Sequence, residues 1–162
     1  MITLTPFVLD EHKELLINWL RRPHVQAAWG DPEKNIAEIL QATPTVTHFL
    51  IMEGRTPVGL IQWQWLGADD LADTGLNVAD DQTIDIDIFI AEIDRLDKGI
   101  GSKAIRSLMA HLRADTQAKR VTLFTGFANK AAIRAYEKCG FACRAQYEDA
   151  EYGWTWVMVA EL

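Results

Sequence analysis

The sequence is poor in cysteine, with only Cys139 and Cys143 among its 162 residues. So few thiols exclude a disulfide framework and indicate a reducing compartment. No cluster of histidines accompanies them, so we expect no metal site. The chain also lacks an apolar run near the roughly 20 residues that span a bilayer, and its first residues form no basic and apolar leader. We therefore expect a cytoplasmic protein with no membrane partner.

Basic residues are in the minority, with 16 Lys and Arg against 23 Asp and Glu, and the net charge is −7. This balance argues against a nucleic-acid partner, because phosphate contacts need a basic face. The two signs are segregated: nine acids and no Lys or Arg lie between Thr56 and Asp94, whereas the net charge from Arg95 to Arg144 is +8. The pattern predicts one region for a cation and one for an anion, or else two solvated surfaces.

Length and composition favour a single domain over residues 1–162, because 49% hydrophobic and 24% charged residues form an ordinary globular mixture. Apolar patterns predict strands over residues 2–9, 48–52, 58–65, 83–90, 121–124, 141–147 and 154–162. Helical periods predict helices over residues 10–21, 32–41 and 129–139, and an amphipathic helix after Ser102 with Ile105, Leu108, Met109 and Leu112. We expect an α/β fold with a mixed, mostly antiparallel central sheet flanked by helices.

Capping residues set the expected ends of these helices. Asp10 and Asp31 are placed to accept hydrogen bonds from first-turn amides. Pro23 is expected to end the first helix, because proline cannot continue the hydrogen-bond ladder. Residues 67–80 are expected to form an acidic loop.

The most informative segment is Lys98-Gly99-Ile100-Gly101, which follows a strand and precedes a helix. Glycines let a ligand approach the backbone, and the free amides of a helix N-terminus bind anions. The dinucleotide and P-loop fingerprints are excluded, because Ala104 stands at the third glycine position and no Gly-Lys-Ser/Thr follows. The segment predicts another kind of pyrophosphate site, with Lys103 and Arg106 close by, or an ordinary strand–helix turn.

Two further sets of polar residues fall on regular elements. Asp85 and Asp87 interrupt an apolar strand at a spacing of two, so both are expected on one strand face, pointing into one cleft. Asn129, Ala132 and Tyr136 lie on roughly one face of the helix predicted about 30 residues after the glycines. Alone, that second set is typical of a capped helix with a packed tyrosine.

Together, Lys98–Ser102 and Asn129–Phe141 resemble the GNAT superfamily of acetyl-CoA-dependent N-acetyltransferases, and the order of elements agrees along nearly the whole chain. Within the superfamily the chain is most similar to aminoglycoside 6′-N-acetyltransferases, an early similarity being His24-Val25-x-x-x-Trp29-Gly30. Two positions depart from the pattern. Leu96 stands where Gln or Arg is common, and Phe124 stands where these enzymes tend to carry an acid.

The resemblance implies a GNAT-like domain that binds acetyl-CoA as cosubstrate and needs no metal. The backbone of Ile88, Phe89 and Ile90 would hold the pantetheine arm like an added strand. The pyrophosphate would lie on the amides of Lys98, Gly99, Ile100, Gly101, Ser102 and Lys103. Asn129 would contact the pantetheine or its bound water, and Ala132 and Tyr136 belong to the same set of cofactor-binding residues.

Acetyl transfer to an amine needs a base, a stabilised oxyanion and an acid for the leaving thiolate. An aliphatic ammonium is mostly charged at neutral pH, so we expect Asp87 to bind it and then accept its proton. Tyr136 is the expected acid, and an amide N–H near Ile88 is the expected oxyanion donor. The alternatives are that Asp87 only accepts hydrogen bonds from neighbouring amides and that Tyr136 only packs in the core.

The acidic middle of the chain suits a polycationic small-molecule amine, and the residues expected to bind it are Trp29, Trp65, Asp70, Asp73, Asp85 and Asp87. Trp63 is expected to face away from Trp65. Three functions stay open: acetylation of an aminoglycoside or similar amine, acetylation of a siderophore precursor or protein N-terminus, and non-catalytic binding of CoA or a drug. A monomer or homodimer is expected, with His24, His48 and His111 as structural or surface residues.

Overall fold

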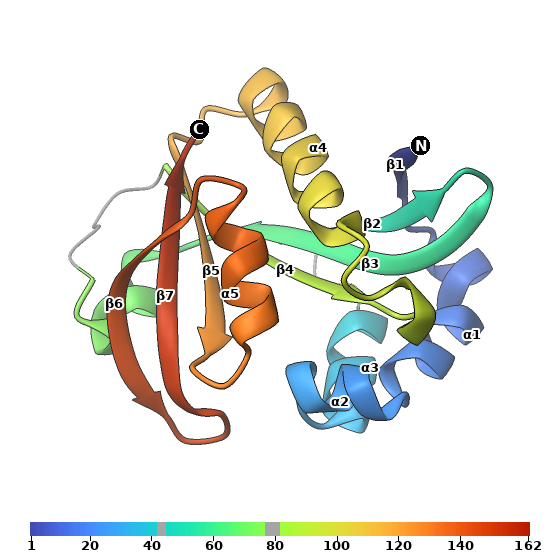
Figure 1. Cartoon of the computed structure of the whole chain (residues 1–162), viewed down its shortest axis with the longest axis horizontal. Helices are drawn as coiled ribbons and strands as arrows, with labels where there is room; N and C mark the ends of the chain where they lie inside the picture. Colours follow the sequence, from blue (N-terminus) through green and yellow to red (C-terminus); the bar gives the residue numbers. More distant parts are fainter. Residues whose placement is uncertain (42–44, 77–81) are drawn as a thin grey trace.

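Within the part of the chain that the structure describes, seven strands join edge to edge in one sheet, in the order β1-β2-β3-β4-β5-β7-β6 (Figure 1). The computed structural model describes residues 1–41, 45–76 and 82–162. The strands are β1 Ile2–Pro6, β2 Val46–Glu53, β3 Thr56–Trp65, β4 Thr83–Ile90, β5 Arg120–Gly126, β6 Ala142–Asp149 and β7 Gly153–Glu161. The β4–β5 pair is parallel and the other pairs are antiparallel. The α/β fold with a mixed, mostly antiparallel sheet is therefore confirmed.

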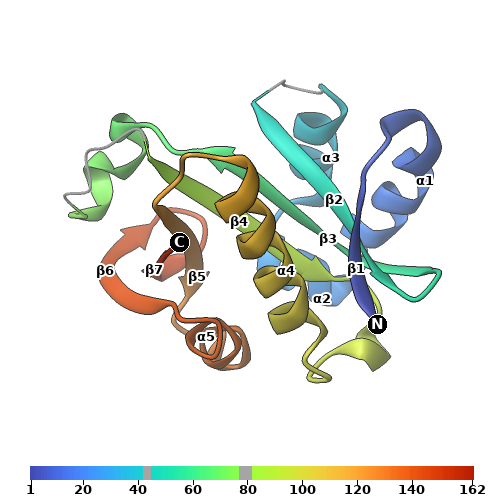
Figure 2. The same cartoon turned by 90° about the horizontal axis from the view of Figure 1, so that it is seen from above.

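Helices cover both faces of the sheet (Figure 2). One face carries α1 Leu9–Leu20, α2 Pro23–Trp29 and α3 Pro32–Leu40, and the other carries α4 Ile100–Asp115 and α5 Lys130–Glu137. Neighbouring strand positions alternate between the two layers: Leu60 and Phe89 pack with Trp19 of α1, whereas Ile61 packs with Ile105 of α4. These two apolar cores fix which side chains of each strand face which helices.

The other described elements are the short 3-10 helices η1 Ala68–Thr74 and η2 Ile93–Arg95. Of the acidic loop predicted over residues 67–80, η1 takes the first part, and residues 77–80 lie outside the described residues. Within the described ranges, no helix combines the length and the apolar character that a bilayer crossing would require.

β4 and β5 pair over a short length and then separate (Figure 1). Their register joins residues 83–85 to residues 120–122, after which β4 stays with β3 and β5 stays with β7. The amide of Ala91 donates to β3 at 2.8 Å, so by the antiparallel alternation Ile88 and Ile90 turn their backbone groups away from β3. These groups face the gap between β4 and β5.

The N-terminal helices differ in two ways from the sequence prediction. The N-cap of α1 is Val8 rather than Asp10, and its amide donates to Nδ1 of His12 at 2.9 Å, so a ring nitrogen takes the place of a capping oxygen. Pro23 does not only end a helix: it begins α2, which the sequence did not predict, because a first-turn residue needs no N–H. Asp31 caps α3 as predicted, accepting from the Glu33 amide at 2.9 Å.

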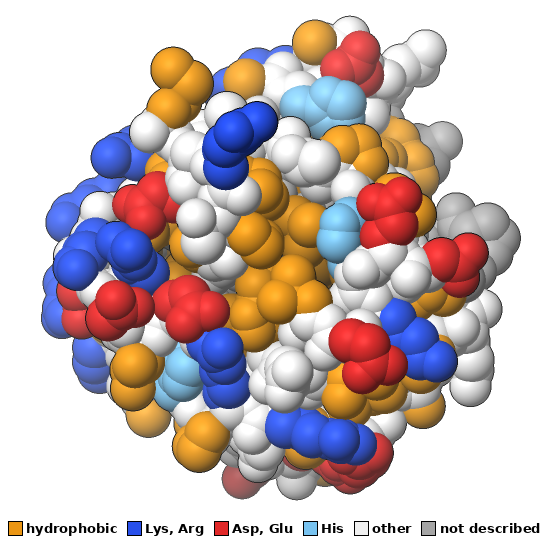
Figure 3. Space-filling view, turned by 90° about the vertical axis from the view of Figure 1, so that its right-hand side faces the viewer, with side chains coloured by type: hydrophobic (Ala, Val, Ile, Leu, Met, Phe, Trp, Pro, Cys, Tyr) orange, Lys and Arg blue, Asp and Glu red, His pale blue; other side chains and the backbone are white. Residues whose placement is uncertain are grey.

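The face on the right-hand side of Figure 1 carries hydrophobic side chains at its centre, surrounded by charged side chains of both signs (Figure 3). The segregation of charge along the sequence therefore does not translate into a single-sign field on this face. Charge complementarity has to be judged from the residues that line a site.

Candidate active site

A cleft of about 760 Å³ lies where β4 and β5 separate. Its walls come from α2, α3 and α5, from β2 to β5, and from the turn between β6 and β7. Among the predicted site residues, it is lined by Trp29, Asp87, Ile88, Asn129 and Tyr136. The fold therefore brings the two expected catalytic side chains into one space, together with part of the expected cofactor and acceptor sites.

Asp87 lies half-buried on β4, directly opposite Gln62 of β3. Nε2 of Gln62 donates to Oδ2 of Asp87 at 3.2 Å. Burial raises the pKa of Asp87, and the hydrogen bond from Gln62 opposes that rise. A carboxylate with a raised pKa accepts a proton more readily, which suits a general base.

Asp85 shares the strand face of Asp87 but is buried in the sheet. The Thr122 hydroxyl of β5 donates to Oδ1 of Asp85 at 3.0 Å. The pKa of Asp85 lies well above its ordinary value, first because of burial and then because of the charge of Asp87. Of the two carboxylates expected to point into one cleft, Asp87 is the one that lines it.

Tyr136 reaches the cleft from α5, with its ring 6.3 Å from that of Phe141. Burial raises the pKa of its phenol, and the negative charge of Asp87 raises it further. The phenol therefore keeps its proton at neutral pH. A protonated hydroxyl in the same cleft as a carboxylate is an arrangement suited to donating a proton where the carboxylate accepts one.

Trp29 is the last residue of α2 and contacts β4. Its indole Nε1 donates to the carbonyl of Ile88 at 3.2 Å, and its ring meets Phe89 edge-on with centroids 4.8 Å apart. The sequence predicted an acceptor platform here. The structure adds that this tryptophan is anchored to the strand edge at the gap, with Phe89 itself buried in the core beneath it.

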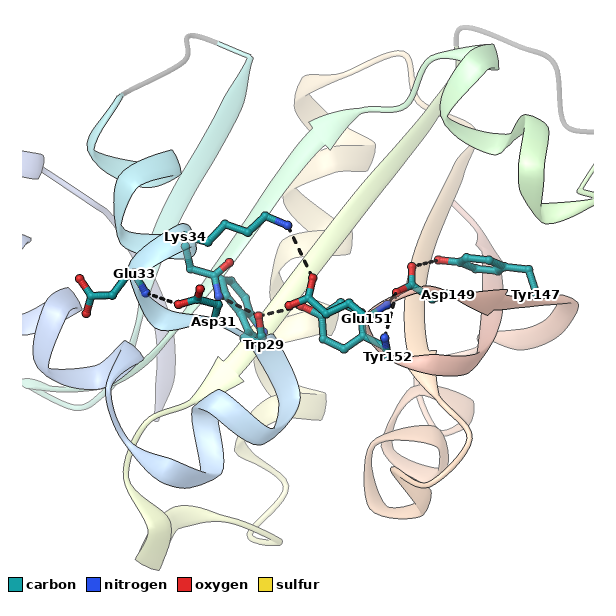
Figure 4. Close-up of polar contacts among 9 residues, drawn as sticks. Trp29, Asp31, Glu33, Lys34, Tyr147, Asp149, Glu151 and Tyr152 are labelled. Atoms are coloured by element: carbon teal, nitrogen blue, oxygen red, sulfur yellow. Dashed lines mark hydrogen bonds and ion pairs between the residues drawn. The ribbon is translucent and has the colours of Figure 1, made fainter.

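The turn between β6 and β7 crosses to the N-terminal helices (Figure 4). The Tyr152 hydroxyl donates to the carbonyl of Trp29 at 2.9 Å, and Nζ of Lys34 lies 3.6 Å from Oε2 of Glu151. Asp149 accepts from the amides of Glu151 and Tyr152 at 2.8 and 2.9 Å, which shapes the turn. This bridge joins residues more than a hundred positions apart in the sequence.

Sequence reasoning missed the acidic part of this bridge. Asp149 and Glu151 line the cleft together with Glu38 of α3, whereas the expected acids came from the middle of the chain. The signal was an acid-rich stretch, Glu148-Asp149-Ala150-Glu151, between the strands predicted over residues 141–147 and 154–162 and flanked by tyrosines. Nothing in that local pattern indicates which distant element the turn contacts.

The glycine segment forms the start of α4. Gly99 has φ +73° and Asp97 has φ +58°, a left-handed conformation that glycine adopts without strain. A Cβ at Gly99 would meet no atom within 4 Å, so this side of the turn is open. Ser102 is buried, and its hydroxyl lies 3.4 Å from the carbonyl of Ala135 in α5. Its amide, rather than its hydroxyl, is therefore the group available to an anion.

Asn129 and Ala132 sit at the start of α5. Oδ1 of Asn129 accepts from the Ala132 amide at 3.3 Å, so the asparagine caps its own helix. The sequence predicted that Asn129 begins this helix, and the structure places it there and in the wall of the cleft. Phe124 also lines the cleft, edge-on to Tyr147 with ring centroids 6.1 Å apart.

Three of the expected acceptor residues lie elsewhere or are not described. Trp65 is exposed and packs edge-on against Trp63 with centroids 6.4 Å apart. The prediction that these two face opposite ways is wrong, because residues two apart share a strand face. Asp70 accepts from the Gly67 amide at 2.7 Å and so caps η1. The side chain of Asp73 lies outside the described part of the structure.

Potential metal ligands are dispersed. Across the ranges that the structure describes, no three His, Cys, Asp or Glu side chains gather in a way that could hold a metal ion. The cleft is lined by carboxylate and phenol side chains, among them Asp87 and Tyr136.

Comparison with known proteins gives consistent matches. A family model described as an acetyltransferase (GNAT) domain matches residues 8–148. An aminoglycoside N(6′)-acetyltransferase type 1 of Klebsiella pneumoniae is 29% identical over 155 residues, covering 86% of this chain and 74% of that protein. The crystal structure of the aminoglycoside acetyltransferase AAC(6′)-Ib with coenzyme A matches at a TM-score of 0.83 and 26% identity, covering 99% of this chain and 95% of that one. The same enzyme with coenzyme A and kanamycin matches at 0.83 and 25% identity, with the same coverage.

Replacing Asp85 with Asn is expected to stabilise the fold by an amount that grows with pH. The raised pKa means that the folded protein holds the Asp85 proton more tightly than the unfolded chain. Its contribution to stability is therefore lost as the pH rises from about 4 through the folded-state pKa. Asn buries no charge and keeps an oxygen for Thr122. Urea unfolding of both proteins across this pH range measures the effect.

The matched control for this prediction is Asp69→Asn, which removes an exposed acid from η1. Its effect on the free energy of unfolding is measured over the same pH range. A pH-independent difference for Asp85→Asn would contradict a raised pKa at Asp85.

Proposed function

The chain belongs to the acetyltransferase (GNAT) family, and we propose that it transfers an acetyl group from acetyl-CoA to a primary amine of a polycationic acceptor, in the first place the 6′-amino group of an aminoglycoside. The observation that carries this proposal is Asp87, a carboxylate of raised pKa that lines the same cleft as the phenol of Tyr136. The similarity to aminoglycoside N(6′)-acetyltransferases along most of the chain supports the choice of acceptor.

The charge of the cleft favours a cationic acceptor. Among the described residues, its lining carboxylates are Glu38, Asp87, Asp149 and Glu151, and its lining cation is Lys34. Each ammonium of a polycation can pair with one carboxylate, and such pairs strengthen where the cleft excludes water. An acceptor ammonium and Lys34 would compete for Glu151, because Lys34 lies 3.6 Å from that carboxylate.

The gap between β4 and β5 is the proposed binding site of acetyl-CoA. The N–H groups of Ile88 and Ile90 face it, since both residues turn away from β3. The first-turn amides of α4 from Ile100, together with the open side of Gly99, would take the pyrophosphate. Lys98 and Lys103 are exposed beside this turn and would add positive charge. Asn129, the N-cap of α5, lines the cleft and would contact the pantetheine, with Ala132 in the first turn after it.

The chemistry follows from these positions. Asp87 binds the acceptor ammonium and removes one proton, which frees the nitrogen lone pair to attack the thioester carbonyl carbon. The N–H of Ile88 stabilises the oxyanion that forms. The carbon–sulfur bond then breaks, and Tyr136 protonates the thiolate of coenzyme A. The second proton that the nitrogen loses as it becomes an amide restores the Tyr136 phenol, and Asp87 keeps the first. The proposal places this reaction in the cytoplasm, in keeping with the free thiols of Cys139 and Cys143, and assigns it to a monomer or homodimer.

A turnover screen tests the acceptor. With acetyl-CoA, release of free thiol should be fastest with aminoglycosides that carry a 6′-amino group, and matched compounds with a 6′-hydroxyl should be poor acceptors. The KM for the acceptor should rise with added salt, because the pairing is electrostatic. Preferential turnover of a neutral or anionic amine, or of a peptide N-terminus, would overturn the proposed acceptor.

Asp87→Asn should lower kcat by about 10²–10⁴-fold, because the amide cannot accept the ammonium proton. Steady-state kinetics with saturating acetyl-CoA and acceptor measures the loss. Asp69→Asn makes the same charge change on an exposed residue of η1 and should keep full activity. A fully active Asp87→Asn protein would remove Asp87 from the mechanism.

Tyr136→Phe should lower kcat by about 10²-fold, at the lower end of the range for a lost general acid. The ring contact with Phe141 is retained, so the free energy of unfolding and the affinity for coenzyme A should change little. Calorimetry and urea unfolding check those two quantities beside the turnover number. Unchanged turnover, including in a single-turnover measurement that bypasses product release, would mean that Tyr136 only packs.

A further inference from the structure

Three neighbouring strands place His48, Gln62 and Asp87 in a row across the sheet. His48 of β2 stands opposite Gln62 of β3, and Gln62 stands opposite Asp87 of β4. All three line the cleft. Side chains directly opposite on adjacent strands lie about 4.5–5.5 Å apart at their Cβ atoms, so Gln62 is within reach of both neighbours.

The amide of Gln62 is oriented by the carboxylate. Nε2 donates to Oδ2 of Asp87 at 3.2 Å, and an ionised carboxylate can only accept, so the NH₂ end must face it. The buried Oε1 is then the end of the amide left for the interaction with His48. The contact with Asp87 therefore involves the NH₂ end of Gln62 alone.

His48 supports the same row from the other side. Burial lowers the pKa of His48, and its interaction with Gln62 raises it in part. The imidazole is therefore neutral near pH 7 and places no positive charge beside the row. The donor that acts on Asp87 from β3 is accordingly the Gln62 amide.

We propose that Gln62 is a positioning residue, which occupies Oδ2 of Asp87 and leaves Oδ1 directed to the acceptor ammonium. This inference rests on the proposed function, because it assigns Gln62 a part in the same acetyl transfer. Without the amide, the carboxyl group can rotate about its terminal bond, whose torsion is broad. The Asp87 carboxylate then also loses a hydrogen bond that favours its charged form.

Other titratable groups lie near Asp87, and their effects on its pKa have to be distinguished from the effect of Gln62. Asp85 lies two residues away on β4, and its pKa depends on the charge of Asp87. Tyr136 faces the cleft from α5. The remaining titratable residues of the lining, apart from His48, come from α3 and from β6 and its turn to β7: Lys34, Glu38, Tyr147, Asp149, Glu151 and Tyr152. Substituting Gln62 changes none of these charges.

Gln62→Met tests the proposal, because it keeps the length of the side chain and removes both polar atoms. Titration of the Asp87 carboxyl carbon by NMR, assigned with Asp87→Asn, should show a pKa higher by about one to two units, as the loss of a hydrogen bond to a charged group predicts. The acidic limb of kcat against pH should move in the same direction, while the KM for acetyl-CoA stays unchanged. The midpoint of urea unfolding, measured beside the titration, separates this effect from a general loss of stability.

Gln64→Met is the matched control, since Gln64 lies on the same strand and stands opposite Asp85 rather than Asp87. This substitution should leave the pKa of Asp87 unchanged. A lower unfolding midpoint for Gln62→Met with no shift at Asp87 would mean a structural role only and would overturn the proposal, as would an equal shift in Gln64→Met. If no amine is acetylated, the proposed function fails, whereas the NMR titration still reports whether Gln62 acts on Asp87.

Discussion

A β-strand that loses its neighbour has to satisfy its backbone groups in another way, and β4 faces this requirement beyond Asp85. There β5 stops pairing with it and continues with β7. The resulting gap opens the cleft, presents the edge of Ile88 and Ile90, and sets Asp87 in the cleft wall. The candidate site is therefore a consequence of how two strands part rather than of a specialised loop.

Side chains from the N-terminal helices provide hydrogen-bond partners for the carbonyl groups at this end of β4. Arg22 donates to the carbonyl of Ala91 at 2.7 Å, Nε2 of His24 lies 3.1 Å from that of Ile90, and Trp29 donates to that of Ile88. The segment around α2 thus covers the oxygens of the strand end and leaves amide N–H groups toward the gap. An edge of this polarity suits a partner rich in carbonyl oxygens, as an acetylated pantetheine is.

Local pattern was enough to predict the parts of the fold that depend on local chemistry. The apolar alternation of residues 83–90 predicted β4 with the bounds observed, and Asp31 before Pro32 predicted a capped helix. The parts that depend on strand register or on distant contacts were not accessible in this way. Gln62 becomes informative only once β3 is aligned with Asp87, and Glu151 only once its turn reaches Lys34.

The contacts between α4 and α5 have a consequence for the length of the acyl donor. The Ser102 hydroxyl lies 3.4 Å from the carbonyl of Ala135, the Cys139 thiol lies 3.5 Å from the carbonyl of Ser102, and Arg106 donates to that of Lys138 at 2.8 Å. These links hold the turn at the start of α4 at a set distance from Tyr136. In the proposed binding mode the two helices therefore fix the distance between the phosphate site and the phenol. A thioester with a shorter arm cannot bind its phosphate at α4 and present its sulfur to Tyr136 at the same time.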